Sequence, residues 1–336
     1  MRALYLVCCT LALLCGPAAG DTLSEVKARG AVRCGTTING PGWAYTDAQG
    51  VMRGFDVDFC RALGAAIFGD AAKAVPVPVP PVNAFATLAA GEIDLLNHRF
   101  TWTFNRDNGI GIETLLVLFH DGQGFMVPKS LGVAHIAALD GASICAAQGT
   151  TTELNIADYF AAHRLSYKIV SFANADETRI AYEQGRCDAW SNDASSLATR
   201  LSLLRNPAEH MILPEIISKE PVGPMVRQGD DHWAHLVRWT YFALIEAEEL
   251  GISSGNVAAM RRESGNPEIK RLLGSGDDLG QKLGLAPDWA YNAILQVGNY
   301  GEIFARNLGA ESPIGLARGR NELWSKGGLI FSPPFR

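Results

Sequence analysis

Apolar residues along this chain fall alternately into short continuous runs and into helical spacing, as in proteins that alternate strands with helices. Phe55, Phe59, Leu63 and Ile67 recur every four residues up to Gly69, which is typical of a helix with a glycine stop. The other elements expected in the first part are a helix over residues 22–29, a strand over 31–36, a helix over 84–90 and a strand over 93–96. This order predicts a parallel sheet covered by helices.

Residues 75–81 read Val-Pro-Val-Pro-Val-Pro-Pro and stand apart from this pattern. Proline has no amide hydrogen to donate to a neighbouring strand, so a central position in the sheet is excluded. The segment is therefore expected to form an edge or irregular strand.

A second, smaller α/β unit is predicted further along, with strands over 143–147, 168–172 and 188–191 and helices from about 153 to 163 and from 176 to 184. Segments 119–126 and 213–227, rich in glycine and proline, flank this unit as two hinge crossings. The expected organisation is a discontinuous first lobe (21–120 and 225–336) and a second lobe (125–217). The C-terminal third is predicted to be helical, most clearly over 232–250 and 289–307.

The first twenty residues have the features of a signal peptide. Arg2 precedes a short apolar run, Pro17 breaks it, and Ala18-Ala19-Gly20 places small residues at a cleavage site before Asp21. The run is too short to span a bilayer. A lipid anchor at Cys15 is the alternative, but Leu14 stands where lipoprotein sites carry a small residue. We therefore expect cleavage near Gly20 and a soluble exported product.

Charge and motifs narrow the classes of function. The 336-residue chain has 29 Lys and Arg against 35 Asp and Glu, and without Arg2 of the leader the balance is 28 − 35 = −7. This mild acidity argues against nucleic acid as a partner. The sequence has no G-x-S-x-G, P-loop or H-E-x-x-H motif, so neither a cofactor nor a metal is expected.

Four cysteines remain once the leader is removed: Cys34, Cys60, Cys145 and Cys187. An even number in an exported protein indicates disulfides, with three possible pairings. If each lobe keeps its own bridge, the pairs are Cys34–Cys60 and Cys145–Cys187, whereas a bridge between lobes would lock the hinge. Four buried free thiols are the alternative.

Several motifs together resemble the general L-amino-acid-binding proteins of polar amino-acid ABC importers. The matching stretches, which span the whole mature chain, are Gly54-Phe-Asp-Val-Asp-Phe-Cys60, Thr101-Trp-Thr103 with Arg106-Asp107, Asp121-Gly-Gln-Gly-Phe125, Gly149-Thr-Thr-Thr-Glu-Leu-Asn155, Gly185-Arg-Cys-Asp188, Ser218-Lys-Glu-Pro221 and Val297-Gly-Asn-Tyr-Gly-Glu-Ile303. The resemblance implies a two-lobe type II periplasmic binding protein fold with two hinge crossovers and a helical C-terminal extension.

A free amino acid presents a carboxylate and an ammonium, and the sequence offers a partner for each. Arg106 follows the strand at 93–96 and its loop, where its guanidinium fork can bind a carboxylate through two hydrogen bonds. A surface ion pair with Asp107 is the alternative, which the resemblance disfavours. Asp193 follows the strand at 188–191 and suits the ammonium, with N-capping of the next helix as its alternative.

Three threonines and a tryptophan complete the expected site. Thr150 and Glu153 fit a capping box at a strand-to-helix turn, while Thr151 and Thr152 are expected to face the ligand. The resemblance implies that Thr151 helps to bind the ligand carboxylate, that Trp43 lays its ring against the ligand, and that Thr101 places a hydroxyl near Arg106. Packing of Trp43 against the lobe is the alternative.

One stretch departs from the family pattern. Relatives read Ser-Arg-Asn-Thr before Thr-Trp-Thr, whereas this chain reads Asn97-His98-Arg99-Phe100. His98 and Arg99 are expected to face the ligand, so either the side-chain specificity changes or the pocket rim has drifted.

The sequence therefore predicts a monomeric periplasmic protein, not an enzyme, that captures L-amino acids in an interlobe cleft. Its expected partners are the permease subunits of an inner-membrane ABC importer. A dehydratase-like enzyme using His98 as acid or base is one alternative, because histidine titrates near neutrality. A ligand-sensing protein is the other.

Overall fold

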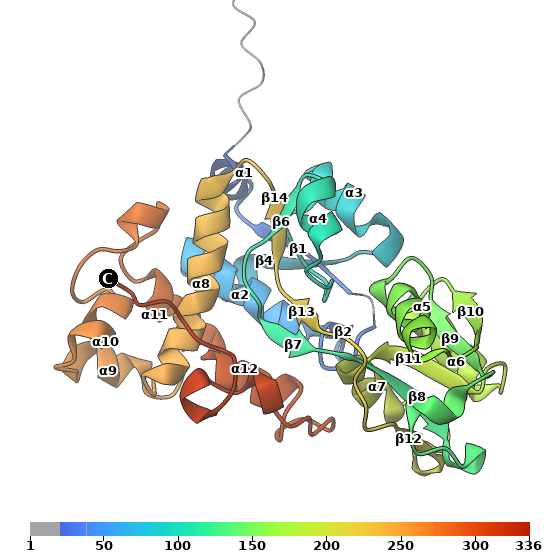
Figure 1. Ribbon diagram of the computed structural model, residues 1–336. Coiled ribbons are helices and arrows are strands. Elements are labelled where there is room, and N and C mark those ends of the chain that lie inside the picture. Colours follow the sequence, from blue (N-terminus) through green and yellow to red (C-terminus); the bar gives the residue numbers. More distant parts are fainter. Residues whose placement is uncertain (1–20, 38) are drawn as a thin grey trace, which may run out of the picture.

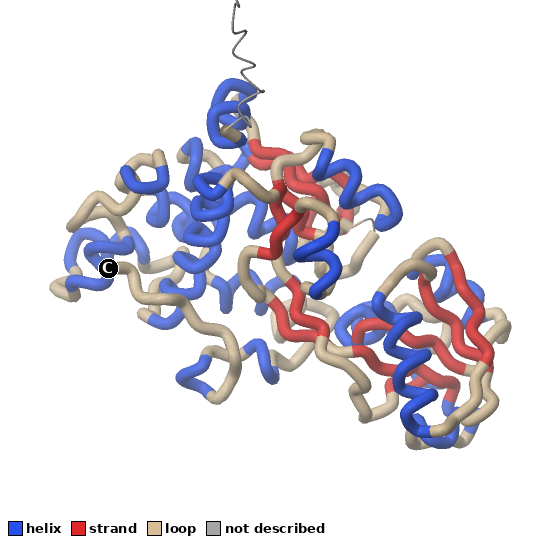
Figure 2. The backbone as a smooth tube through the Cα atoms, turned by 45° about the horizontal axis from the view of Figure 1, so that its top comes forward, coloured by secondary structure: helices blue, strands red, loops and turns tan. Residues whose placement is uncertain are grey.

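The computed structural model describes residues 21–37 and 39–336, so the predicted leader (1–20) lies outside the described residues. The chain forms two α/β lobes of unequal size, linked by two extended segments (Figure 1). Figure 2 shows one group of strands in each lobe, with helices on both sides of each group. None of the helices in this described part is long and apolar enough to cross a membrane.

The larger lobe contains a five-stranded mixed sheet in the order β4-β1-β5-β14-β6. Its strands are β4 (Ala74–Pro78), β1 (Val32–Thr36), β5 (Leu95–Asn97), β14 (Met225–Arg227) and β6 (Ile112–Thr114). The first three run parallel, as predicted, and the proline-rich strand β4 lies at the edge. β14 pairs antiparallel with both β5 and β6, so the expectation of an all-parallel sheet is wrong for this side.

Helices of this lobe follow the sequence signals closely. α2 (Phe55–Phe68) buries most of its residues between the sheet and the C-terminal helices, and Gly69 ends it in a left-handed conformation, with φ of 69°. The other elements are α1 (Thr22–Arg29), α3 (Ala84–Ala89), α4 (Phe104–Gly109) and the small hairpin of β2 (Tyr45–Thr46) and β3 (Met52–Arg53).

The smaller lobe has a sheet of the same kind, in the order β10-β9-β11-β8-β12. Its strands are β8 (Gln123–Pro128), β9 (Ser143–Ala147), β10 (Lys168–Phe172), β11 (Ala189–Asp193) and β12 (His210–Ile212), and its helices are α5 (Thr151–His163), α6 (Ala175–Glu183) and α7 (Ala194–Leu201). β9, β10 and β11 run parallel, and β8 lies antiparallel between β11 and β12. The carboxyl ends of β9 and β11 face the larger lobe.

The two crossings between lobes form their own small ribbon. β7 (Phe119–Asp121) pairs antiparallel with β13 (Glu220–Val222), and Thr101 adds an isolated bridge to Val222 on the other edge. β8 follows β7 into the smaller lobe, and β14 returns the chain to the larger sheet. Two adjacent crossings of this kind permit a hinge motion of one lobe against the other.

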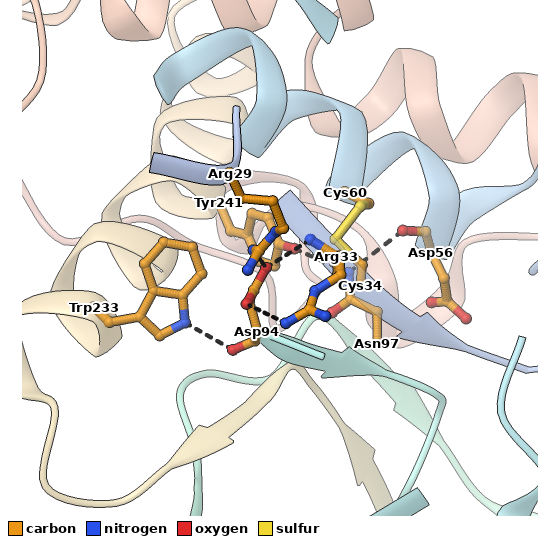
Figure 3. Close-up of a disulfide and its surroundings, with 9 residues drawn as sticks. All are labelled: Arg29, Arg33, Cys34, Asp56, Cys60, Asp94, Asn97, Trp233 and Tyr241. Carbon is orange, nitrogen blue, oxygen red and sulfur yellow. Dashed lines mark hydrogen bonds and ion pairs between the residues drawn. A yellow bond between two sulfur atoms is a disulfide. The ribbon is translucent and has the colours of Figure 1, made fainter. Parts of the chain in front are cut away.

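Each lobe keeps its own disulfide. Cys34 on β1 is bonded to Cys60 on α2, and Cys145 on β9 is bonded to Cys187 just before β11. Figure 3 shows the first bridge beside the buried carboxylate of Asp94, which pairs with Arg29 and accepts a hydrogen bond from the Arg33 amide at 2.7 Å. Neither bridge crosses the hinge, so neither prevents the lobes from moving.

Helices of the C-terminal third extend the core of the larger lobe. They are α8 (Asp231–Glu249), α9 (Val257–Glu263), α10 (Pro267–Leu272), α11 (Trp289–Val297) and α12 (Tyr300–Asn307). The stretch predicted as one helix over 289–307 is broken, because Gly298 adopts φ of 92° and Asn299 starts α12 with a capping box to Glu302. The chain end returns to this core, where Phe335 packs against Trp239 and Trp289.

Single turns of 3₁₀ helix complete the structure, at Ala71–Lys73, Pro81–Asn83, Lys129–Leu131, Ile136–Leu139, Pro207–Glu209, Gln281–Leu283, Gly319–Asn321 and Trp324–Lys326.

Candidate functional site

A cavity of about 600 Å³ lies between the lobes, at the ends of their central strands. Such a volume is typical of sites that enclose a small molecule. The larger lobe contributes His98, Arg99, Phe100, Thr101 and Arg106, and the smaller lobe contributes Thr150, Thr151, Thr152, Asp176, Asp193, Ser196 and Arg200. Seven of the eight expected ligand-binding residues therefore share one cavity.

Arg106 lies on the short helix α4, which begins after Thr103. Its Nη1 donates a hydrogen bond to the Thr101 carbonyl at 2.8 Å, and its guanidinium lies over the rings of Phe85 and Phe100. Burial lowers the pKa of Arg106, which nevertheless stays charged at neutral pH. No carboxylate among the described residues lies within ion-pair distance of it, and Asp107 accepts from the Thr114 amide instead. The guanidinium is thus held in place without an internal anion.

Asp193 ends β11, directly before helix α7. Within the described chain, no hydrogen bond joins its carboxylate to the first turn of α7, so the N-capping alternative is not what the structure shows. Burial and the negative charge of Asp121 raise the pKa of Asp193 to about 8, against the opposing effects of Arg99 and Arg106. A cationic ligand group beside this carboxylate would favour its ionised form.

The turn before α5 differs from the predicted capping box. The Thr150 hydroxyl donates to the Ala147 carbonyl at 2.7 Å, and the Glu153 carboxylate accepts from the Gly149 amide at 2.9 Å. The predicted box is wrong because Glu153 reaches one residue further back than the N-cap. Among the described residues no side chain caps this helix, so the first amides of α5 remain available to an anion in the cavity.

Thr151 and Thr101 meet across the cleft. Their hydroxyl oxygens lie 3.4 Å apart, and both donate to one carboxylate oxygen of Glu220 in the hinge strand β13. Asn155 of α5 donates to the other oxygen of Glu220 at 2.6 Å. Glu220 therefore joins the two lobes through a buried set of hydrogen bonds.

Trp43 does not lie where the sequence predicted. Its side chain is 1% exposed and packs edge-to-face against Phe55 and Phe119 in the core of the larger lobe. It is absent from the described lining of the cavity, so the expected ring against the ligand is a wrong prediction. The guanidinium of Arg99 lies over the Trp43 ring, 5.0 Å from its centroid, and presents a charge to the cavity instead.

His98 is buried at the edge of the same cavity. Its Nε2 lies 2.8 Å from the Val79 carbonyl and its ring stacks on Phe100 at 4.6 Å. Burial lowers the pKa of His98 to about 4, so the imidazole is neutral at physiological pH. A general acid or base is most effective when its pKa lies near the operating pH, and His98 is far from that condition.

Sequence reasoning missed Arg200, which lines the cavity from α7. A signal was present, because Arg200 lies seven residues after Asp193 and four after Ser196, which is the spacing of one helix face. Glu220 was also missed as a partner of the site, although it belongs to the stretch Ser218-Lys-Glu-Pro221.

The chain is similar to known proteins over nearly its whole length. Residues 32–254 match the bacterial extracellular solute-binding proteins, family 3. The chain is 52% identical over 328 residues to the general L-amino acid-binding periplasmic protein AapJ of Rhizobium johnstonii, covering 97% of this chain and 96% of that protein. It is 49% identical to the glutamate/glutamine/aspartate/asparagine-binding protein BztA of Rhodobacter capsulatus, over 97% of this chain and 96% of that one.

A solved structure shares the whole architecture. It is an ABC transporter periplasmic binding protein from Brucella ovis with glutathione bound, which superposes with a TM-score of 0.92 and 49% identity. The superposition covers 94% of this chain and 100% of that one. The arrangement of both lobes and of the C-terminal helices is thus shared with a protein that binds a small molecule.

Proposed function

Because the chain belongs to family 3 of the bacterial extracellular solute-binding proteins, we propose that it captures free L-α-amino acids between its lobes and delivers them to an ABC importer. Its close relatives are binding proteins, and the chain is a solute-binding protein rather than an enzyme. The proposal depends most on one observation: Arg106 from the larger lobe and Asp193 from the smaller lobe line the same cavity.

The proposed roles follow from charge and geometry. Arg106 binds the ligand carboxylate through its free guanidinium edge. The backbone amides of Thr151 and Thr152 and the Thr152 hydroxyl, at the start of α5, are further donors, while the Thr151 hydroxyl donates to Glu220. Asp193 binds the ammonium, and Thr101 orients the Arg106 side chain through its carbonyl. Glutathione, which the Brucella relative holds, carries the same α-carboxylate and α-ammonium on its γ-glutamyl residue.

The setting follows from the relatives. We propose a periplasmic location and permease subunits in the inner membrane as partners, since AapJ is described as periplasmic and the Brucella protein as part of an ABC transporter. We further propose a monomer with a lobe over 21–120 and 225–336, a lobe over 125–217, hinge segments at 119–126 and 213–227, and Gly20 as the last residue of the leader.

A panel of the common L-amino acids tests the proposal by thermal shift and calorimetry. A ligand at 100 times its Kd should stabilise the protein by about 2.7 kcal/mol and raise its Tm. D-enantiomers of the best ligands serve as matched controls, because they reverse the placement of carboxylate and ammonium. A panel in which no L-amino acid changes the Tm or releases heat would overturn the proposed function.

Ligand affinity should also rise with pH between 6 and 8. In the empty cleft the pKa of Asp193 is about 8, raised by burial and by Asp121, and a bound ammonium favours the carboxylate and lowers that pKa. Binding below pH 8 therefore releases a proton, and the affinity should increase by up to about tenfold per pH unit. Above pH 8 this gain ends, because Asp193 is already ionised.

Calorimetry in two buffers of different ionisation enthalpy measures the proton released on binding. Asp193→Asn should bind more weakly and lose this release, whereas Asp176→Asn at the rim should keep it. An affinity that is constant from pH 6 to pH 8 in the wild-type protein would contradict the assignment of the ammonium to Asp193.

A further inference from the structure

The cavity carries more positive charge than a simple zwitterion requires. Three guanidinium groups line it, from Arg99, Arg106 and Arg200. In the proposed function, Arg106 binds the ligand carboxylate and Asp193 binds the ligand ammonium. Arg99 and Arg200 then have no ligand group to bind. Two further acids line the cavity: Asp176, which pairs with Arg200 and has a side chain that is 38% exposed, and Glu177, which is exposed.

Arg200 is held in the smaller lobe with its charge largely buried. Its side chain is 2% exposed, and Nη1 donates to the Ser196 hydroxyl at 2.8 Å. Nε has no hydrogen-bond partner within the described part of the chain, and it lies 3.7 Å from the Asp176 carboxylate. Burial, and next the charge of Arg99, lower the pKa of Arg200 to about 10, so the side chain is still cationic at neutral pH. A buried charge of this kind is costly, and its ion pair with the partly exposed Asp176 leaves Nε without a hydrogen bond.

Arg99 approaches the same space from the larger lobe. Its Nε and Nη1 are buried and have no hydrogen-bond partner in residues 21–37 and 39–336, and its backbone is left-handed, with φ of 59°. That conformation is uncommon for a bulky residue and costs conformational energy. Asp56, Asp121 and Asp193 face Arg99, but burial raises the pKa of all three, that of Asp56 and that of Asp193 to about 8. Asp56 and Asp193, largely protonated in the empty cleft, therefore neutralise Arg99 only in part at neutral pH.

Closure of the lobes therefore brings two like charges toward one cavity. Repulsion between Arg99 and Arg200 opposes closure, and an anion bound between them turns both charges into attractive partners. The volume of about 600 Å³ leaves room for a ligand larger than an amino-acid head group.

We infer that Arg99 and Arg200 form a second anion site, and that the ligand is an α-amino acid whose side chain ends in a further carboxylate. This inference rests on the proposed function, since Arg106 and Asp193 hold the α-amino-acid head group. Acidic amino acids and γ-glutamyl peptides share the required chemistry: one ammonium and two carboxylates. The side-chain carboxylate of an acidic ligand binds between Arg99 and Arg200 more tightly than the side-chain amide of glutamine or asparagine. Only the carboxylate is charged, so only it forms charge-assisted hydrogen bonds with both guanidinium groups.

Isothermal calorimetry with matched ligand pairs tests the inference on the full mature protein. L-Glutamate and L-glutamine have nearly the same shape and differ by one charge, as do L-aspartate and L-asparagine, and glutathione tests the longer ligand. At neutral pH and low salt the acid of the preferred pair should bind at least about tenfold more tightly than its amide. Equal affinity for acid and amide in both pairs, with glutathione not binding, would overturn the second anion site.

Variants separate this site from the head-group site. Arg200→Gln should weaken glutamate at least about tenfold and leave glutamine within about threefold. Arg205→Gln, which removes an exposed charge of the same lobe outside the cavity, should change neither. Arg99→Asn provides the same test if Arg200→Gln does not fold, because asparagine tolerates the left-handed backbone at this position. A parallel loss of glutamate and glutamine in these variants would contradict the inference.

The outcomes also distinguish the two proposals. If glutamate and glutamine bind equally and both are lost in Arg106→Ala, the amino-acid head-group site stands and the second anion site falls. If glutathione alone binds and loses affinity in Arg200→Gln, the second anion site stands and the free amino acid is replaced as ligand. If neither free amino acids nor glutathione bind, both proposals fail.

Discussion

Arg106→Ala should abolish amino-acid binding at any concentration near the wild-type Kd. Removal of one partner of a buried charged pair costs about 2–5 kcal/mol, which raises Kd roughly 30-fold to several thousandfold. The loss is large because no other described cation takes the position of Arg106 on α4, over the rings of Phe85 and Phe100. Arg106→Lys should recover only part of the affinity, since an ammonium lacks the planar fork that matches two carboxylate oxygens.

The Tm of the ligand-free Arg106→Ala protein shows whether the variant loses binding alone or also loses folding stability. Among the described residues the Arg106 side chain forms one hydrogen bond, to the Thr101 carbonyl, so the Tm of the empty variant should fall by only a few degrees. Arg61→Ala, at a partly exposed site on the same lobe, is the matched control and should bind as the wild type does. An Arg106→Ala protein that binds amino acids with unchanged Kd would show that another residue holds the carboxylate.

The double variant Cys145→Ala/Cys187→Ala should lose about 4 kcal/mol of unfolding free energy. This bridge closes a loop of 42 residues between β9 and the start of β11, and the chain-entropy model gives about that value for such a loop. The corresponding Cys34→Ala/Cys60→Ala variant, with a separation of 26 residues, should lose about 3.5 kcal/mol. These losses would lower the Tm of the smaller lobe by about 20 degrees and that of the larger lobe by about 8 degrees.

Denaturant unfolding monitored separately in each lobe measures these losses. Trp190 reports on the smaller lobe, and Trp233 and Trp289 report on the larger one. Because each bridge lies within one lobe, each double variant should affect mainly the transition of its own lobe. Wild-type protein treated with a reductant should behave like the variants combined. Loss of both transitions to the same extent in one double variant would argue against independent bridges.

Much of the fold could be predicted because local signals and tertiary structure agree. Glycines at 30, 69 and 91 mark helix ends, and the apolar runs at 143–147 and 168–172 coincide with β9 and β10. The proline-rich segment was assigned to an edge from its missing donors, and β4 lies there. The antiparallel strands β6 and β14 were missed, because their pairing joins residues more than a hundred positions apart and leaves no local pattern.

The candidate site likewise divides into features that local sequence signals predict and features that they do not. The sequence predicts a shared cleft for Arg106 and Asp193 because each is expected to follow a strand, and the carboxyl ends of strands meet at one cleft; both residues line one cavity in the structure. Trp43 was misplaced because a tryptophan in a loop suits a core as well as a ligand, and only tertiary packing against Phe119 decides. The break in the helix at Gly298 depends on a backbone angle. The position of Arg200 in the cavity depends on the approach of the opposite lobe. The spacing of apolar residues encodes neither.

The buried carboxylate of Glu220 has a consequence for the time that a ligand stays bound. Thr101 from the larger lobe and Thr151 and Asn155 from the smaller one all donate to it, so the lobes cannot separate until some of these bonds break. Hydrogen bonds to a charged group contribute about 1.5–3 kcal/mol each. Dissociation should therefore be slow, with a rate constant set by the opening of the lobes. Fast unloading then depends on the importer, which must supply contacts that pull the two lobes apart.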